Sequence, residues 1–123
     1  MHVLVIDDDA ATRSLLEKQL RANEYEVTLA ENGLDGLMRL ETLTPDVIVC
    51  DINMPKLNGL EFIKAIKDRQ DTRAIPVIFL TSETDPQAMI KGINVGARYF
   101  LTKPLDAKEL LWKIKRILAP PKT

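Results

Sequence analysis

Carboxylates follow two strongly apolar runs in this 123-residue chain. Asp51 comes directly after residues 47–50, and Asp7 and Asp8 come directly after residues 3–6. Such runs are typical of strands buried in a parallel sheet, where ligands bind at the carboxyl ends. Carboxylates held together repel one another, and Mg²⁺ relieves the repulsion while accepting phosphate oxygens as further ligands. The pattern predicts that Asp51 is a nucleophile that accepts a phosphoryl group beside a metal ion.

Two other polar side chains also follow predicted strands. Thr81 comes after residues 77–80, and its hydroxyl can donate a hydrogen bond to a phosphoryl oxygen. Lys103 comes shortly after residues 98–101 and offers a compact positive charge. Its bond to Pro104 has a realistic chance of being cis, which would turn the lysine toward the crevice. Each residue alone has an ordinary explanation as a cap, turn or surface residue, but their shared position at strand ends favours one phosphoryl site.

Five strand-then-helix units are needed to position these side chains. The expected strands are residues 3–6, 26–30, 46–50, 77–80 and 98–101. A helix is expected after each strand. Apolar residues at helical spacing indicate four of the five helices: Leu15, Leu16 and Leu20 for the first; Leu34, Leu37 and Met38 for the second; Leu60, Ile63 and Ile66 for the third; and Leu110, Leu111, Ile114, Ile117 and Leu118 for the last. The fourth helix is expected to start at Asp85-Pro86 and to end just before Gly96. This alternation predicts an α/β fold with a parallel five-stranded sheet between two helical layers. For five strands we favour the order 2-1-3-4-5 over 3-2-1-4-5. In that order the first and third strands are neighbours.

The bulk composition is that of a single globular domain. Apolar residues make up 46% and charged residues 28% of the chain, which excludes a disordered segment. The net charge of −1 gives no reason to expect binding to nucleic acid or to membranes. Cys50, the single cysteine, cannot form an internal disulfide, and no signal peptide is visible. We expect a cytoplasmic domain over residues 1–119, with residues 120–123 as a tail or the start of a linker.

The same residues form a combination of motifs that extends over nearly the whole chain. The motifs are Asp7-Asp8, Asp51-Ile-Asn-Met-Pro-x-x-x-Gly59, Thr81-Ser82, Gly96-Ala97 and Lys103-Pro104. In these motifs, and in the intervals of 30 residues from Asp51 to Thr81 and 22 from Thr81 to Lys103, the chain resembles the receiver domains of two-component response regulators, including the chemotaxis regulator. The resemblance implies a three-layer (βα)5 flavodoxin-like fold, and our preference for the order 2-1-3-4-5 draws on it as well.

The resemblance implies a role for each carboxylate of the crevice. Asp51 would take its phosphoryl group from a phosphohistidine on a sensor histidine kinase or a phosphotransfer protein. Asp8, Asp51 and the backbone carbonyl of Asn53 would ligate Mg²⁺, for which Mn²⁺ is expected to substitute. Asp7 would act mostly through bound water.

The resemblance also implies how phosphorylation is reported. Thr81 and Lys103 would contact the phosphoryl oxygens, and Thr81 would move toward them as Phe100, at the family's switch-aromatic position, turns inward. The surface of the fourth helix, fifth strand and fifth helix would then control a downstream protein or an attached output domain. Asn53 and Glu83 occupy positions that tune the lifetime of the phosphoryl group, and because both are polar we expect a short lifetime. The only catalysis would be self-phosphorylation and autodephosphorylation.

Trp112 lies opposite the apolar stripe of the last helix, so we expect it to be exposed. Tyr99 and Phe100 are expected in the same surface. An exposed aromatic residue is often incidental, but Trp and Tyr are also enriched in protein interfaces. We therefore expect Tyr99 and Trp112 to contribute to a partner surface or to a dimer that forms on phosphorylation.

Three other functions share parts of this pattern. An aspartyl-nucleophile phosphatase would also place a carboxylate after a strand, but such enzymes resemble a pattern with a second aspartate two residues on, where this chain has Asn53. A nucleotide-binding module would need a glycine-rich loop after the first strand, where this chain has Asp7-Asp8-Asp9. A receiver-like scaffold without phosphorylation is disfavoured because every acceptor position is intact. Whether the chain stands alone or belongs to a longer regulator stays open.

Overall fold

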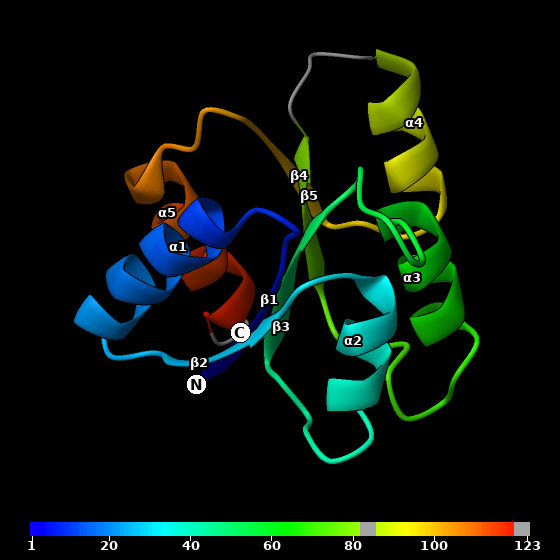
Figure 1. The fold of residues 1–123 in the computed structure, drawn as a ribbon, viewed down its shortest axis with the longest axis horizontal. Coiled ribbons are helices and arrows are strands. Elements are labelled where there is room, and N and C mark those ends of the chain that lie inside the picture. The colour runs from blue at the N-terminus through cyan, green and yellow to red at the C-terminus, as the bar shows by residue number, and fades with distance from the viewer. Residues whose placement is uncertain (82–85, 120–123) are drawn as a thin grey trace.

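The chain folds into strands and helices that alternate along the sequence (Figure 1). The computed structural model describes residues 1–81 and 86–119. The strands are β1 (His2–Ile6), β2 (Glu26–Ala30), β3 (Val47–Asp51), β4 (Val77–Thr81) and β5 (Tyr99–Thr102). The helices are α1 (Ala10–Ala22), α2 (Gly33–Arg39), α3 (Gly59–Lys67), α4 (Pro86–Asn94) and α5 (Ala107–Leu118). All strand pairs are parallel and the order is β2-β1-β3-β4-β5, which confirms the predicted topology.

The sheet lies between two helical layers. Helices α1 and α5 cover one face, and α2, α3 and α4 cover the other, as Figure 1 shows. Each layer closes over its own apolar cluster: Leu16 and Ile114 belong to the α1–α5 side, and Phe62 and Phe79 to the opposite side. The inner strands β1, β3 and β4 are buried almost throughout, which explains their uninterrupted apolar runs. In the described parts of the chain, no helix is long and apolar enough to cross a membrane.

The bounds of four strands differ by one residue from those expected: β1 begins at His2, β4 includes Thr81, and β3 and β5 each lie one residue later. Strand β3 includes Asp51, which pairs in register with Leu80 of β4, and excludes Asp46. The Asp46 side chain instead accepts a 2.7 Å hydrogen bond from the backbone N–H of His2. Strand β5 runs one residue later than expected, over Tyr99–Thr102. Asp51 is therefore held by the sheet itself and not by the following loop.

Side chains cap the helices that begin near the carboxyl edge of the sheet. Asp9 caps α1 by accepting a 3.0 Å hydrogen bond from the backbone N–H of Thr12. Asn58 begins α3 with a capping box, in which its side chain and that of Glu61 accept from each other's backbone N–H groups. Gly96 follows the end of α4 with a φ of +110°, a conformation that glycine adopts readily, and its predicted place after this helix is confirmed.

Three apolar residues that the predicted stripes turned toward the core are exposed. Leu15 of α1 and Leu34 and Met38 of α2 have exposed fractions of 47%, 51% and 62%. Helix α2 has only seven residues and packs through its glycines, since a Cβ atom at Gly36 would lie 2.6 Å from Cδ1 of Ile6. The helix backbone therefore occupies the space that we assigned to larger side chains. The predicted stripes are wrong at these three positions.

Some predictions fall outside the described residues. They concern Ser82 of the Thr81-Ser82 motif, Glu83, the helix start at Asp85, and the tail over residues 120–123. Helix α4 begins at Pro86 and helix α5 ends at Leu118, which agrees with the helix start and the helix end that the sequence predicts there.

Candidate functional site

Three aspartates converge where β1 and β3 end. Asp7 and Asp8 follow β1, Asp51 is the last residue of β3, and the two strands are neighbours in the sheet. One carboxylate oxygen from each residue lies within 4.8 Å of the others. Asp7 and Asp51 are buried, with exposed fractions of 0% and 5%, whereas Asp8 is exposed. The structure therefore brings the three predicted carboxylates together in one acidic crevice.

Lys103 reaches the acidic crevice from the loop after β5. Its Nζ lies 3.0 Å from Oδ2 of Asp7 and 3.3 Å from Oδ2 of Asp51. Its backbone N–H donates a 2.7 Å hydrogen bond to the carbonyl oxygen of Thr81, which joins this loop to the end of β4. The bond from Lys103 to Pro104 is cis, as the sequence suggested. The lysine thus contacts both buried carboxylates.

The crevice holds more negative charge than Lys103 balances. Burial, followed by the neighbouring carboxylate of Asp7, raises the pKa of Asp51 to about 6, against the opposing effects of Lys103 and of the Asn53 backbone N–H. Burial lowers the pKa of Lys103, but the carboxylates of Asp7 and Asp51 raise it by more, so the ammonium group stays charged. A site with this imbalance attracts a further cation near neutral pH.

The donor atoms of the crevice fit a hard divalent cation. Oδ1 of Asp7 accepts a 2.9 Å hydrogen bond from the backbone N–H of Asp9. Oδ2 of Asp7 is buried, and the Lys103 ammonium lies 3.0 Å from it. One ammonium shared between Asp7 and Asp51 leaves negative charge that a metal ion beside these oxygens would balance. With Asp8 and Asp51, Asp7 forms an all-oxygen donor set, which suits Mg²⁺ or Mn²⁺.

The loop between β3 and α3 holds Asn53 beside Asp51. The backbone N–H of Asn53 donates a long hydrogen bond, 3.3 Å, to Oδ1 of Asp51, and the Asn53 side chain is exposed. The N–H of Gly59 donates to the carbonyl of Ile52 at 2.9 Å. A Cβ atom at Gly59 would lie 2.5 Å from the carbonyl oxygen of Asp51. Only glycine therefore lets α3 begin this close to the crevice, which explains the Asp51-to-Gly59 spacing of the motif.

One residue of the crevice was not predicted from the sequence. Nη1 of Arg13, on α1, donates a 2.7 Å hydrogen bond to the backbone carbonyl of Asp7. In the same helix, the hydrogen bonds from Thr12 to the cap residue Asp9 lower the pKa of Asp9. Helix α1 thus fixes the loop that carries Asp7 and Asp8 from two points. The sequence could have indicated this contact, because Arg13 lies one turn after Asp9, the cap of a helix that starts beside the carboxylates.

Thr81 and Phe100 lie on the neighbouring strands β4 and β5, which precede and follow α4 in the sequence. Thr81 is buried at the end of β4, at the same sheet edge as Asp51. Phe100 is half-buried, and the centroid of its ring lies 5.8 Å from that of Phe79. A Cβ atom at Gly92 of α4 would come within 2.4 Å of this ring. Phe100 therefore packs directly beneath α4.

Tyr99 and Phe100 point to opposite faces of the sheet, so Tyr99 lies on the α5 side of the expected surface and Phe100 on its α4 side. Tyr99 packs against the apolar cluster of the α1–α5 side, and Nζ of Lys113 lies 5.9 Å from its ring centroid. Phe100 packs against the cluster on the α4 side. Neighbouring residues of a strand alternate between faces, which accounts for the difference. Trp112 is 57% exposed, as predicted, and the Arg116 guanidinium lies 5.3 Å from its ring centroid.

Comparison of the sequence with known proteins agrees with this geometry. The family model of the response regulator receiver domain matches residues 3–115. The chain is 35% identical over 118 residues to the response regulator MprA of Mycobacterium avium, a match that covers 96% of this chain and 51% of MprA. The chain thus spans about half the length of the curated relatives that it matches.

Solved structures show the same fold and the same family. The chemotaxis protein CheY4 of Vibrio cholerae has a TM-score of 0.90 and 35% identity, and the match covers 95% of this chain and 98% of that one. The receiver domain of the sensor histidine kinase PA1611 from Pseudomonas aeruginosa, solved with a magnesium ion coordinated in its active site cleft, has a TM-score of 0.89 and 25% identity, with 97% and 98% covered. By sequence, by fold and by the residues gathered at the ends of its strands, the chain belongs to the response regulator receiver domains.

Proposed function

We propose that this receiver domain accepts a phosphoryl group on Asp51 and thereby changes the surface formed by α4, β5 and α5. The observation that carries the proposal is the contact of buried Asp51 with Lys103, 3.3 Å away, in a cluster that also holds Asp7 and Asp8. A lysine in a purely structural ion pair needs only one carboxylate beside it. Three carboxylates beside one lysine leave an excess of negative charge, which attracts a divalent cation, and the cation can then bind the oxygens of a phosphoryl group. Membership of the response regulator family supports the same reaction.

In the proposed transfer, a carboxylate oxygen of Asp51 attacks the phosphorus of a phosphohistidine on a sensor kinase or phosphotransfer protein. The new O–P bond forms as the N–P bond breaks, and the imidazole nitrogen of the donor takes up a proton. Asp8, Asp51 and the backbone carbonyl of Asn53 would hold Mg²⁺ or Mn²⁺, with Asp7 reaching the ion through water. When bound, the ion would neutralise charge on the phosphoryl oxygens. The ammonium of Lys103, already in contact with Asp51, would follow the phosphoryl group as a second positive charge.

Thr81 and Phe100 would transmit phosphorylation to α4. The Thr81 hydroxyl would donate a hydrogen bond to a phosphoryl oxygen, and Phe100 would turn further inward beneath Gly92. Gly92 lowers the helical propensity of α4 by about 1 kcal/mol relative to alanine, which favours movement of this helix. The switch would therefore act through the packing of one ring against one glycine.

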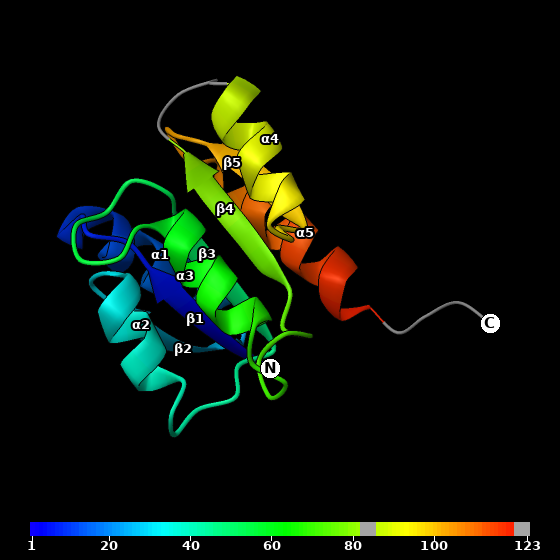
Figure 2. The ribbon, with the colours of Figure 1, turned by 90° about the vertical axis from the view of Figure 1, so that its right-hand side faces the viewer.

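The surface that would change carries exposed apolar side chains. Ile90 and Ile93 of α4 and Trp112 of α5 are each more than half exposed, and α4 and α5 flank β5 at the edge of the sheet (Figure 2). Exposed groups of this kind mark interfaces, and half-buried Tyr99 would add a smaller share. We propose that a downstream protein, an attached output domain or a second phosphorylated copy binds here in the cytoplasm. The domain itself would contact neither nucleic acid nor membrane, and its only catalysis would be on its own phosphoryl group.

The phosphoryl group would have a short lifetime. The exposed Asn53 side chain next to Asp51 would admit and orient an attacking water, with Glu83 as its partner in this role. Replacing both by apolar residues, as in Asn53→Met with Glu83→Leu, should slow the loss of the phosphoryl group. An unchanged decay rate would contradict this part of the proposal.

The central test is incubation with acetyl phosphate and Mg²⁺, followed by intact mass spectrometry. We expect one phosphoryl group on the wild type, none on Asp51→Asn, and none on the wild type when a chelator removes the metal. Asp71→Asn, at an exposed aspartate paired with Arg69, is the matched control and should be phosphorylated normally. A folded wild type that takes up no phosphoryl group, or an undiminished adduct on Asp51→Asn, would overturn the proposal and favour a receiver that acts as a scaffold.

A further inference from the structure

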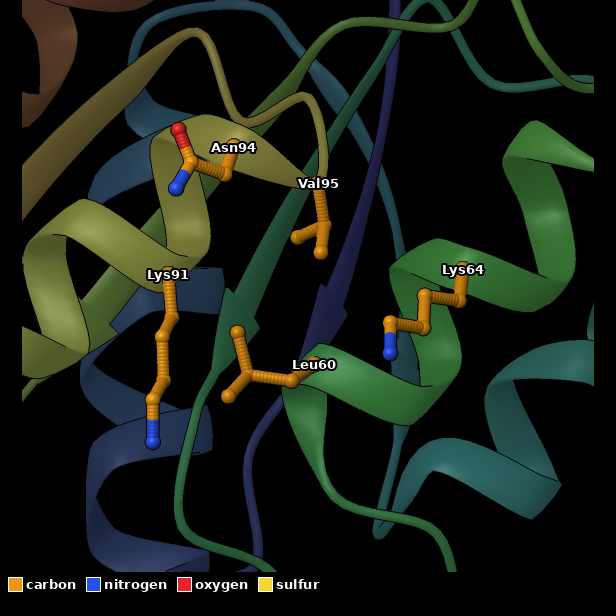
Figure 3. A pocket seen from close by; sticks show the side chains of 5 residues that line it. All are labelled: Leu60, Lys64, Lys91, Asn94 and Val95. Atoms are coloured by element: carbon orange, nitrogen blue, oxygen red, sulfur yellow. The ribbon is translucent and has the colours of Figure 1, made fainter.

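A groove separates α3 from α4 on the side of the sheet away from α1 and α5 (Figure 3). It has a volume of about 410 Å³, and it is lined by Leu60, Lys64, Lys91, Asn94 and Val95. Leu60 and Val95 are half-buried and pack against the apolar cluster of this side, so they form an apolar floor. In Figure 3 these two side chains lie between Lys64 on one wall and Lys91 on the other. The groove is therefore apolar at its base and cationic along both rims.

The two rim lysines are exposed, and the acidic residues one turn from Lys64 on α3, Glu61 and Asp68, form no ion pair with them in the described part of the chain. Within residues 1–81 and 86–119, neither Lys64 nor Lys91 makes an ion pair or a side-chain hydrogen bond, whereas Lys103 and Lys113 each pair with carboxylates. Glu61, the acidic residue of the first turn of α3, is engaged in the capping box.

Further positive charge lies one turn along α3. The Lys67 Nζ donates to the carbonyl oxygen of Arg73 at 2.9 Å, and burial followed by the charge of Arg98 lowers the pKa of Lys67. Lys67 therefore adds to the positive charge that Lys64 places on α3. An anionic group that entered the groove would be attracted by Lys64 and Lys91.

We propose that the groove between α3 and α4 is a docking site for an acidic segment of a partner protein, in which an apolar side chain lies on Leu60 and Val95 and flanking carboxylates pair with Lys64 and Lys91. The volume is at the lower end for small-molecule pockets and suits one or two side chains. A nucleic-acid backbone would satisfy the lysines but would cover the apolar floor with phosphate, and the lining offers no aromatic ring for a base. A peptide with both kinds of group matches both parts of the groove.

This site is distinct from the surface of Ile90, Ile93 and Trp112. The groove uses Lys91 and Asn94 of α4 together with α3, and it includes none of the crevice residues. Binding is expected in the unphosphorylated protein, so the inference does not depend on the proposed phosphoryl transfer.

The test is titration of the ¹⁵N-labelled unphosphorylated chain with two capped peptides, EELLEE and EEFFEE, followed by ¹H–¹⁵N NMR. We expect the amide signals of Lys64, Lys91, Asn94 and Val95 to shift with at least one peptide. Lys64→Glu with Lys91→Glu should weaken that binding at least tenfold, and added salt should weaken it as well. The peptide KKLLKK should not bind.

Two controls separate the local effect from general ones. Lys18→Glu with Lys115→Glu makes the same change of net charge at exposed lysines of α1 and α5, and it should leave peptide affinity within about twofold. Lys64→Arg with Lys91→Arg keeps both charges and should retain binding. Because all four lysines border solvent, these variants should fold, and thermal unfolding checks that they do.

Other occupants give different outcomes. No shift with either peptide at millimolar concentration, or shifts that the double charge reversal leaves unchanged, would overturn the proposal. Shifts of the same signals with octanoate but with neither peptide would overturn it in favour of a small organic anion. Shifts that appear on raising the protein concentration alone would overturn it in favour of a second copy of the chain.

Discussion

The acidic crevice has an excess of negative charge that is mostly buried, whereas the α3–α4 groove has positive charge that is exposed to solvent. In the crevice, Asp7 and Asp51 are buried at the ends of inner strands and share Lys103. In the groove, Lys64 and Lys91 are exposed to solvent at the rims of an apolar floor. Water screens the second pair and not the first. The comparison indicates that burial, more than the number of charges, decides how strongly a charged residue affects folding.

The largest effect should follow removal of Lys103. In Lys103→Met the buried carboxylates of Asp7 and Asp51 lose the ammonium that contacts them, and we expect the free energy of unfolding to fall by about 3 kcal/mol at pH 8 without metal. Denaturant unfolding measures this change. Lys108→Met, at an exposed lysine of α5, should change stability by less than about 0.5 kcal/mol.

Magnesium should recover part of the loss in Lys103→Met, because a bound cation replaces the missing charge. At a concentration one hundred times its Kd, a ligand of the native state contributes about 2.7 kcal/mol by mass action. If Lys103→Met were as stable as Lys108→Met, the contrast between the crevice and the solvent-exposed surface would be wrong.

A smaller effect of opposite sign is expected for Asp51→Asn, which removes one of the repelling carboxylates. Since folding raises the pKa of Asp51 to about 6, the native state binds more protons than the unfolded chain between about pH 4 and pH 6. Wild-type stability should therefore fall as the pH rises through this window, and Asp51→Asn should avoid that fall. The shift corresponds to about 3 kcal/mol, which partial hydration of the crevice reduces to about 2 kcal/mol.

The measurement for Asp51→Asn is denaturant unfolding from pH 4 to pH 8 in the presence of a chelator. The variant should gain stability over the wild type as the pH rises, with little difference at pH 4. A difference that is independent of pH would mean that charge repulsion at Asp51 is not its cause.

The smallest effect is expected in the groove. Lys64→Glu with Lys91→Glu should change the free energy of unfolding by less than about 0.5 kcal/mol, because both side chains are exposed and unpaired. Thermal and denaturant unfolding test this directly. A loss above 1 kcal/mol would show that the two lysines support the packing of α3 against α4, and the two regions would then differ less than the structure indicates.

The sequence predicted the structure best where a single physical requirement, such as burial of a strand on both faces, decides which residues are allowed. The apolar runs of β1, β3 and β4 are typical of buried strands, and polar residues that follow such runs lie at the carboxyl edge of a parallel sheet. The convergence of Asp7, Asp8 and Asp51 followed from this and from the strand order. Prediction was wrong at Leu34 and Met38, since the periodicity of apolar residues does not show that α2 packs through its glycines.

What the sequence alone determined was the order of the strands and helices, the family, and the set of carboxylates with Lys103 at the ends of strands. Local patterns and spacings contain that information, because the residues of one strand or helix share a backbone conformation and alternate between buried and exposed positions in a regular way. Only the tertiary structure decided that Tyr99 and Phe100 face different layers, that Arg13 holds the carbonyl of Asp7, and that Lys64 and Lys91 border one groove. These features depend on side chains from separate elements meeting in space, and that meeting is set by the packing of whole layers and not by the neighbours of a residue in the chain.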